Sequence, residues 1–222
     1  DEYSLWERRN LAKFPTLSTE TVMNGSFMAN FEGYEDLRSY LLSCPKFGNH
    51  EQVVDKEARE IALRVSKMLR TKKNYLGNSF RPDFSSPSTH LLYGYWVGAT
   101  PDGRLARTPI ADGVSPAAGR DLNGPTAAAN SVAKLDHYIA SNGTLFNMKF
   151  HPTALAGRNG LENFVSLVRG YFDQKGSHMQ FNVVSRETLL EAQKHPEQYK
   201  SLVVRVAGYS ALFTTLSKSL QD

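Results

Sequence analysis

Residues 203–210 read Val-Val-Arg-Val-Ala-Gly-Tyr-Ser, and this stretch near the end of the chain decides how the remainder is interpreted. β-Branched residues lead into a glycine, an aromatic residue and a small polar residue. That order predicts a strand, a turn and then a new element. From the local pattern alone, Gly208 is a turn glycine and Leu202–Val206 is the last strand of the chain.

Strand and helix patterns alternate from residue 90 onward, which predicts an α/β fold. The predicted strands are His90–Val97, Thr144–Phe150, Met179–Val184 and Leu202–Val206. The predicted helices run from Pro125 to about Ile139, over Leu161–Phe172 with a glycine cap at Gly176, over Glu187–Lys194 after the N-cap Ser185, and along the terminal stripe Leu212, Phe213, Leu216 and Leu220.

The first part of the chain is predicted to be mainly helical. Residues 1–24 show no clean period, and Asn24–Gly25–Ser26 is interpreted as a turn or a junction. One predicted helix has Phe31, Tyr34, Leu37 and Leu41 on one face and is ended by Pro45. The longest predicted helix covers residues 51–72, with Val54, Ala58, Ile61, Val65 and Met68 buried. A long loop from Asn74 to Ser88 follows, and a loop of this length is either disordered or functional.

Charge and composition exclude several classes of protein. The 222 residues include 26 basic and 22 acidic side chains without a basic run, so we expect no nucleic-acid partner. We find no apolar run of membrane-spanning length and no secretory signal pattern, so we expect a cytoplasmic protein without a membrane partner. The single Cys44 agrees with a reducing compartment, and we interpret it as a small buried hydrophobic residue.

The common hydrolytic sites are absent from the sequence. The six histidines form no pair at the four-residue spacing of a helical metal site, so we expect no metal. The sequence contains neither a phosphate-binding loop followed by Lys-Ser/Thr nor a Gly-x-Ser-x-Gly elbow. Metal, nucleotide and serine hydrolases are therefore excluded.

A pocket is suggested by polar residues around two predicted strands. Asn147, Lys149 and His151 lie on one side of a regular strand, and His90 begins another. These four residues are candidate pocket residues. The alternative interpretation for the side of the strand is an exposed polar face, which is the commoner arrangement.

Several spaced motifs resemble those of the glycyl radical enzymes, the family that includes pyruvate formate-lyase, glycerol dehydratase and choline trimethylamine-lyase. Arg-Val-Ala-Gly-Tyr at 205–209 resembles the radical-bearing loop of the family. Further resemblance lies in Gly-Ala-Thr-Pro-Asp-Gly-Arg (98–104), Ala-Asp-Gly (111–113), Gly-Arg-Asp (119–121) and Gly-Pro-Thr (124–126). The runs Asn142–Pro152 and His178–Val184 resemble the dehydratase and lyase branch.

The resemblance implies a fold and a site. The fold is the C-terminal part of a ten-stranded α/β barrel, with residues 1–84 as a helical segment and loop leading into the barrel, 85–200 as a barrel half, and 201–222 as the radical loop and terminal helix. Gly208 stores the radical, and the residues that support the loop are Arg205, Val206, Tyr209 and Ser210. A glycine has no Cβ to hinder a planar radical centre or its partners. The resemblance places the catalytic cysteine on a loop outside this chain.

The resemblance also implies partners and a reaction. An activating enzyme with S-adenosylmethionine and an iron–sulfur cluster installs the radical, and this chain itself binds no cofactor. The full-length chain is expected to form a homodimer in the cytoplasm of an anaerobic cell. It is expected to act as a lyase that eliminates water or an amine from a small diol or a choline-like substrate. Two alternatives stay open: a decarboxylase or fumarate-adding enzyme of aromatic metabolism, and a non-catalytic spare-part protein.

Overall fold

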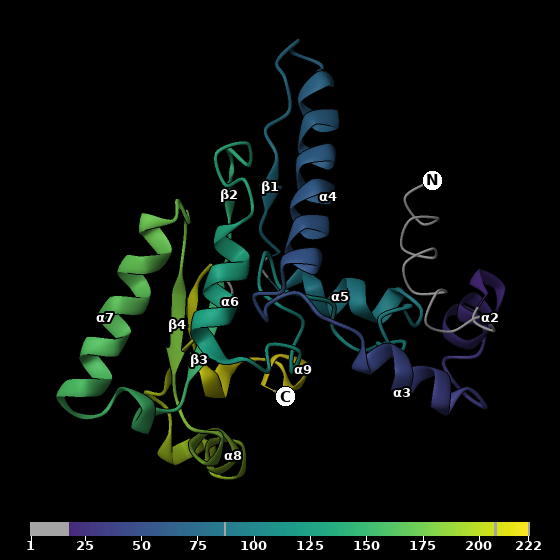
Figure 1. The fold of residues 1–222 in the computed structure, drawn as a ribbon. Helices are drawn as coiled ribbons and strands as arrows, with labels where there is room; N and C mark the ends of the chain where they lie inside the picture. Colours follow the sequence, from purple (N-terminus) through teal and green to yellow (C-terminus); the bar gives the residue numbers. More distant parts are fainter. Residues whose placement is uncertain (1–17, 87, 207, 222) are drawn as a thin grey trace. The chain divides into compact units, whose positions relative to one another are not determined.

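The computed structural model describes residues 18–86, 88–206 and 208–221 (Figure 1). Residues 1–17, which belong to the segment without a predicted period, and Ala207 of the opening stretch lie outside the described residues. The helices are α2 (Thr19–Met23), α3 (Glu35–Ser43), α4 (Gln52–Thr71), α5 (Thr89–Trp96), α6 (Gly124–Ala133), α7 (Gly157–Asp173), α8 (Arg186–Lys194) and α9 (Lys218–Gln221), with one π-helical turn (Asn24–Met28) and 3-10 turns at Pro152–Leu155, Pro196–Gln198 and Phe213–Thr215. The strands are β1 (Asp83–Phe84), β2 (Gly143–Thr144), β3 (Asn147–Phe150), β4 (Gln180–Val183), β5 (Val203–Arg205) and β6 (Ser210–Leu212).

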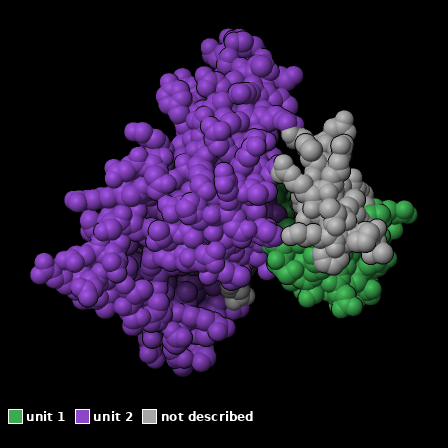
Figure 2. All heavy atoms as spheres, viewed as in Figure 1, with its two compact units in different colours: residues 1–44, 91–109 green, residues 45–90, 110–222 purple. Residues whose placement is uncertain are grey.

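The chain forms two compact units, coloured separately in Figure 2. Unit 1 consists of Asp1–Cys44 and Leu91–Pro109, and unit 2 of Pro45–His90 and Ile110–Asp222. The expected mixture of helices and strands is confirmed. The functional division at residues 84 and 200 stays a prediction.

In unit 1, the turn expected at Asn24–Gly25–Ser26 is wrong, because these residues continue α2 as a π-helical turn. Ser26 is buried and donates its hydroxyl to the carbonyl of Val22 at 2.6 Å. Gly25 serves close packing instead of a turn, since a Cβ there would lie 2.7 Å from Leu37 Cδ2. The next helix, α3, ends before Pro45 as expected. It begins only at Glu35, so Phe31 and Tyr34 of the expected apolar face precede the helix.

The strand expected at His90–Val97 is also wrong, because this run forms α5. A short apolar run is compatible with either element, and periodicity cannot distinguish them. Among the described residues no strand pairs with it.

The turn expected at Pro101–Asp102–Gly103 is confirmed. The amide of Gly103 donates to the carbonyl of Thr100 at 3.0 Å, and Gly103 has φ +93. The guanidinium of Arg104 then donates to several carbonyls of the same loop, including that of Thr108 at 2.7 Å. The Gly-Ala-Thr-Pro-Asp-Gly-Arg motif therefore has a structural role in holding this loop together.

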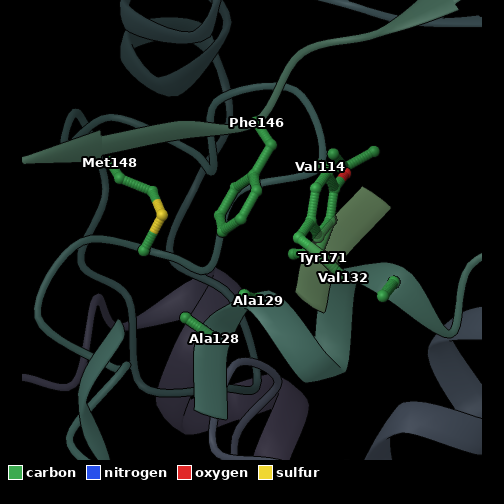
Figure 3. Close-up of a cluster of buried hydrophobic side chains, with 8 residues drawn as sticks. Val114, Ala128, Ala129, Val132, Phe146, Met148 and Tyr171 are labelled. Atoms are coloured by element: carbon green, nitrogen blue, oxygen red, sulfur yellow. The ribbon is translucent and has the colours of Figure 1, made fainter. Parts of the chain in front are cut away.

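Unit 2 is built on a β3–α7–β4 arrangement in which the two strands are parallel (Figure 1). Asn147 pairs with Gln180 and Phe150 with Val183, and β1 pairs with β2, also in parallel. The alternation predicted for residues 144–150 is confirmed, since Phe146 and Met148 are buried. The single strand expected there is divided into β2, which ends at Thr144, and β3, which begins at Asn147. Figure 3 shows these two side chains pointing toward Ala128 and Ala129 of α6.

Two helix ends in unit 2 differ from the expectation. The helix expected from Pro125 to about Ile139 is α6, which begins at Gly124 and ends at Ala133. After α7 the left-handed residue is Lys175, with φ +73. Gly176 is instead required because a Cβ would overlap the ring of the buried Tyr171.

The last strand expected at Leu202–Val206 is present as β5, but it is not the last. A further strand, β6, pairs antiparallel with it, with Val203 opposite Leu212 and Arg205 opposite Ser210. The predicted helical stripe begins at Leu212, the last residue of β6. The pairing with β5 overrides that pattern, so α9 begins only at Lys218.

The longest predicted helix is confirmed as α4, but the prediction of which of its residues are buried is partly wrong. Ile61 and Met68 of the expected apolar face are 57% and 54% exposed. The fully buried positions are the polar residues Asp55 and Ser66. The side of α4 that carries Asp55 is joined to the end of α6 by an ion pair with Lys134.

This ion pair predicts an asymmetric effect on stability. The ammonium of Lys134 lies 2.6 Å from Asp55 Oδ2, and the Asp55 side chain is 1% exposed. Lys134→Met leaves a buried, unpaired carboxylate, so we expect a loss of about 3 kcal/mol in the free energy of unfolding. Asp55→Asn leaves a lysine that can turn to solvent, and we expect a loss of about 1 kcal/mol. Urea unfolding of both variants measures the difference, and equal losses would contradict it.

Candidate active site

The β5–β6 hairpin presents Gly208 at its tip. The amide of Val206 donates to the carbonyl of Tyr209 at 2.9 Å, which closes the hairpin. Gly208 has φ +77, a left-handed conformation that favours glycine. Among the described residues, a Cβ on Gly208 would meet only Leu145 Cδ1, at 3.7 Å, which is ordinary contact. Backbone conformation therefore accounts for glycine here better than crowding does.

The residues around Gly208 hold the hairpin from both sides. Val204 is buried with Ala192 and Phe213, and Val206 packs against this cluster. The hydroxyl of Tyr209 lies 3.2 Å from Ser88 Oγ, while Tyr209 is 40% exposed. Hydrophobic contacts thus fix the strand below the turn.

Arg205 connects the hairpin to β4 and to the turn through polar contacts. Its guanidinium donates to Gln180 Oε1 at 2.9 Å, to Ser210 Oγ at 3.2 Å and to the carbonyl of Gly208 at 3.4 Å. Its backbone amide donates to Asn182 Oδ1 at 2.7 Å, and Asn182 Nδ2 donates back to the Arg205 carbonyl. The side chains of β4 therefore hold β5 in place.

Asn147 joins this hairpin to the segment around Asp112. The amide nitrogen of its side chain donates to Asp112 Oδ2, and its oxygen accepts from Gln180 Nε2. Its backbone amide donates to Ser115 Oγ at 2.9 Å. The Asp112 carboxylate also accepts from Ser86 Oγ at 3.0 Å.

The four candidate pocket residues separate into two groups. His90 Nδ1 lies 3.9 Å from Asp112 Oδ1, so His90 and Asn147 lie near the same carboxylate. Lys149 is exposed, and His151 Nε2 lies 3.8 Å from Glu187 Oε2. The structure does not connect Lys149 or His151 to the hydrogen bonds around Arg205.

Sequence reasoning did not single out Gln180, Asn182, Asp112 or Ser86 as site residues. A signal was present for two of them, because Gln180 and Asn182 are two residues apart in a strand and therefore share a face. That both meet Arg205 depends on β5 lying beside β4, which the sequence does not show.

The described residues show no metal site, and a surface cleft among them lies apart from the hairpin. Within the described ranges no group of three or more His, Cys, Asp or Glu side chains could hold a metal ion. A surface cleft of about 570 Å³ is lined by Arg70, Asn74, Asn78, Ser79, Phe80, Arg81 and Ser141, none of which belongs to the hairpin. No helix in the described part of the chain is both long and apolar enough to cross a membrane.

Two histidines of unit 2 have a lowered pKa. Burial lowers the pKa of His137, whose ring lies between Thr144 Oγ1 at 3.0 Å and the Val132 carbonyl at 2.9 Å. Burial, aided by the charge of Arg205, lowers the pKa of His178. His178 Nδ1 accepts from the amide of Phe146 at 3.3 Å, so this ring nitrogen is unprotonated.

These shifts predict that stability falls on acidification. A histidine with a lowered pKa binds fewer protons in the folded state than in the unfolded state. Its contribution to the free energy of unfolding is therefore fully present above a pH of about 6.5 and decreases as the pH falls below that value. We expect the midpoint temperature of thermal unfolding to decrease when the pH is lowered from about 7.5 to about 5.5. His178→Gln retains an acceptor for the Phe146 amide and should flatten this slope, whereas replacement of the exposed His195 by Gln should not. A midpoint that rises on acidification would contradict the assignment.

Comparisons with known proteins agree with this hairpin. The family model described as "Glycine radical" matches residues 110–214, and the one described as "Pyruvate formate lyase-like" matches residues 19–94. The radical motif thus falls in the first match, and α3 and α4 fall in the second. The chain belongs to the glycyl radical enzyme family, and the expected resemblance is confirmed.

Three relatives show the extent of the similarity. The protein of 1,2-propanediol dehydration in Roseburia inulinivorans is 61% identical, with a TM-score of 0.82 over 85% of this chain and 23% of that chain. The B12-independent glycerol dehydratase from Clostridium butyricum is 51% identical, with a TM-score of 0.89 over 92% and 26%. The trans-4-hydroxy-L-proline dehydratase of Clostridioides difficile is 44% identical over 195 residues, which are 87% of this chain and 25% of the relative. The chain spans about a quarter of the length of the curated relatives it matches.

Proposed function

We propose that Gly208 stores an organic radical and that the intact protein is a glycyl radical lyase. The observation that carries this proposal is the position of Gly208 at the tip of the β5–β6 hairpin, inside the segment that the glycine-radical model matches. Removal of one hydrogen atom from its Cα leaves a radical that the flanking amide groups delocalise. The absence of a Cβ leaves the centre open to a partner that removes or returns that hydrogen.

We propose that the reaction is elimination of a leaving group, and in particular of water from a small diol. Two of the relatives, at high identity, are named for glycerol and 1,2-propanediol dehydration. Dehydration of a 1,2-diol breaks one C–O bond and gives an aldehyde and water without net oxidation. Elimination of an amine from a choline-like substrate belongs to the same reaction class, and decarboxylation does not.

The partner in this proposal is a separate activating enzyme that uses S-adenosylmethionine and an iron–sulfur cluster. The support for it is membership in the family, since glycyl radical enzymes need an activating enzyme. We further propose that the described strands form part of a ten-stranded α/β barrel, which the parallel pairs β1–β2 and β3–β4 support. We place the intact homodimer in the cytoplasm of an anaerobic cell, and the mass of the native assembly measures its subunit number.

The test uses the full-length protein, activated anaerobically and offered glycerol, 1,2-propanediol, choline or an arylacetate in turn. We expect a glycyl doublet in the electron paramagnetic resonance spectrum and an aldehyde from a diol. A doublet accompanied by carbon dioxide from the arylacetate would replace the elimination by a decarboxylation. Absence of the doublet after activation would refute radical storage at Gly208.

The spare-part alternative makes a different prediction. A protein that only replaces a damaged radical loop needs little beyond the loop itself, whereas a second family model matches residues 19–94 of this chain. The mass of the native polypeptide decides between the two. A polypeptide several times longer than this chain supports the enzyme.

A further inference from the structure

A continuous line of side-chain hydrogen bonds joins a carboxylate to the carbonyl of Gly208. Asp112 Oδ2 accepts from Asn147 Nδ2, Asn147 Oδ1 accepts from Gln180 Nε2, and Gln180 Oε1 accepts from Arg205 Nε at 2.9 Å. Arg205 Nη2 then donates to the Gly208 carbonyl at 3.4 Å. We call this line the Asp112 relay. It draws its members from the Ala-Asp-Gly segment, β3, β4 and β5.

The direction of every bond in the relay is fixed by its two ends. An ionised carboxylate only accepts hydrogen bonds, and a guanidinium only donates them. The Asp112 carboxylate therefore requires the amide nitrogen of Asn147 to face it, which turns the Asn147 oxygen toward Gln180. The same constraint turns the Gln180 oxygen toward Arg205. Gln180 is 7% exposed, so water does not readily replace these partners.

The relay controls which nitrogen of Arg205 faces the loop. With Nε held by Gln180, the two Nη atoms point at Ser210 Oγ and the Gly208 carbonyl. A planar guanidinium presents its donors in a fixed fork, so the position of one donor sets the others. Without Gln180 as acceptor, the half-buried Arg205 side chain can rotate away from Gly208.

The acceptor in this last bond is one of the groups over which a glycyl radical spreads its unpaired electron. A cationic donor at a carbonyl oxygen favours electron density on that oxygen. It also fixes the plane of the amide group that follows Gly208.

We propose that Asp112, Asn147 and Gln180 are positioning residues that orient Arg205 on the Gly208 carbonyl and thereby stabilise the glycyl radical. This inference rests on the proposed storage of the radical at Gly208. It assigns a role to three residues that reach Gly208 through Arg205.

The test is Gln180→Leu in the full-length, activated enzyme. Electron–nuclear double resonance in H₂O and D₂O detects the exchangeable proton that Arg205 donates to the radical loop. We expect this coupling in the parent enzyme and its loss in Gln180→Leu, with a radical yield that falls about tenfold, since a hydrogen bond to a charged group is worth about that factor. Gln180→Glu retains an acceptor for Arg205 Nε but loses the donor to Asn147 Oδ1, so it should restore the coupling only in part. Gln174→Leu, in which a glutamine outside the relay is replaced, should retain both coupling and yield.

Arg205→Lys supplies a second test that does not depend on the folding of Gln180→Leu. Lysine keeps the charge but cannot contact Gln180 and Gly208 through a rigid fork, so the coupling should be lost. A parent enzyme without any glycyl doublet would refute the proposed function itself. A parent doublet whose exchangeable coupling persists unchanged in Gln180→Leu, or in Arg205→Lys, would overturn the relay and leave the function standing.

Discussion

Gly208→Ala should abolish the glycyl doublet and substrate turnover in the full-length enzyme after activation. Alanine places a methyl group on the carbon that must become planar and give up a hydrogen atom to a partner. We expect the chain still to fold, because the nearest described atom to a Cβ at Gly208 is Leu145 Cδ1, at 3.7 Å. The left-handed backbone, with φ +77, adds a strain of about 1–2 kcal/mol. Electron paramagnetic resonance and product formation measure the outcome.

Gly119→Ala is the matched control for this prediction. Gly119 has φ +72, and a Cβ there would meet no atom of the described residues within 4 Å, so its replacement introduces the same backbone strain in the same unit. Both variants should lose similar stability, and Gly119→Ala should keep the doublet. A doublet of full strength in Gly208→Ala would place the radical on another residue.

The sequence predicts the β5–β6 hairpin in part, because some of its signals act within a few residues and others depend on distant segments. The β-branched run and Gly208 indicate a strand and a turn because both preferences act within a few residues. The second strand of the hairpin, β6, escapes prediction because it has only three residues and its last one, Leu212, also fits the stripe of a terminal helix. Pairing with β5 decides between the two, and pairing is a tertiary interaction.

The same limit applies to the polar residues around the hairpin. The position of Asn147 on one side of a strand follows from alternation, which the structure confirms for that segment. Its contacts with Asp112 and Gln180 do not follow, because they join segments 35 and 33 residues away. Alternation also cannot show that Lys149, on the same side as Asn147, is exposed. Spacing along one strand therefore identifies candidates, and only the neighbouring strands select among them.

The α5 helix is predicted wrongly for a different reason, because its local sequence pattern does not distinguish a helix from a strand. Its run of leucine and aromatic residues has no polar residue to define a period, and aromatic residues favour strands. Trp96 and Tyr95 are 66% and 57% exposed, so burial does not define a face either. The helix is set by its backbone hydrogen bonds, such as that from the Val97 amide to the Tyr93 carbonyl at 2.8 Å.

Gly113→Ala should be strongly destabilising, and it should also disturb the radical loop. A Cβ at Gly113 would overlap the carbonyl oxygen of Leu145 and lie 3.1 Å from the carbonyl oxygen of Phe84. Both atoms belong to backbone that is already hydrogen-bonded, since the Val114 amide donates to the Leu145 carbonyl at 2.8 Å and the Leu145 amide to the Phe84 carbonyl at 3.1 Å. Because neither oxygen can turn away as a flexible side chain would, these bonds must lengthen.

The expected loss in the free energy of unfolding is about 2–5 kcal/mol, which combines left-handed strain with overpacking. Gly119→Ala again separates the two contributions, because it carries the strain without the overlap. The displacement should reach the hairpin, since the Leu145 side chain lies beside Gly208 and Gly113 adjoins Asp112 of the relay. At a temperature where the variant is still folded, the radical yield should therefore fall more than in Gly119→Ala. A Gly113→Ala variant as stable as the control would show that β1 and β2 can separate, and that the close approach at Gly113 is not required.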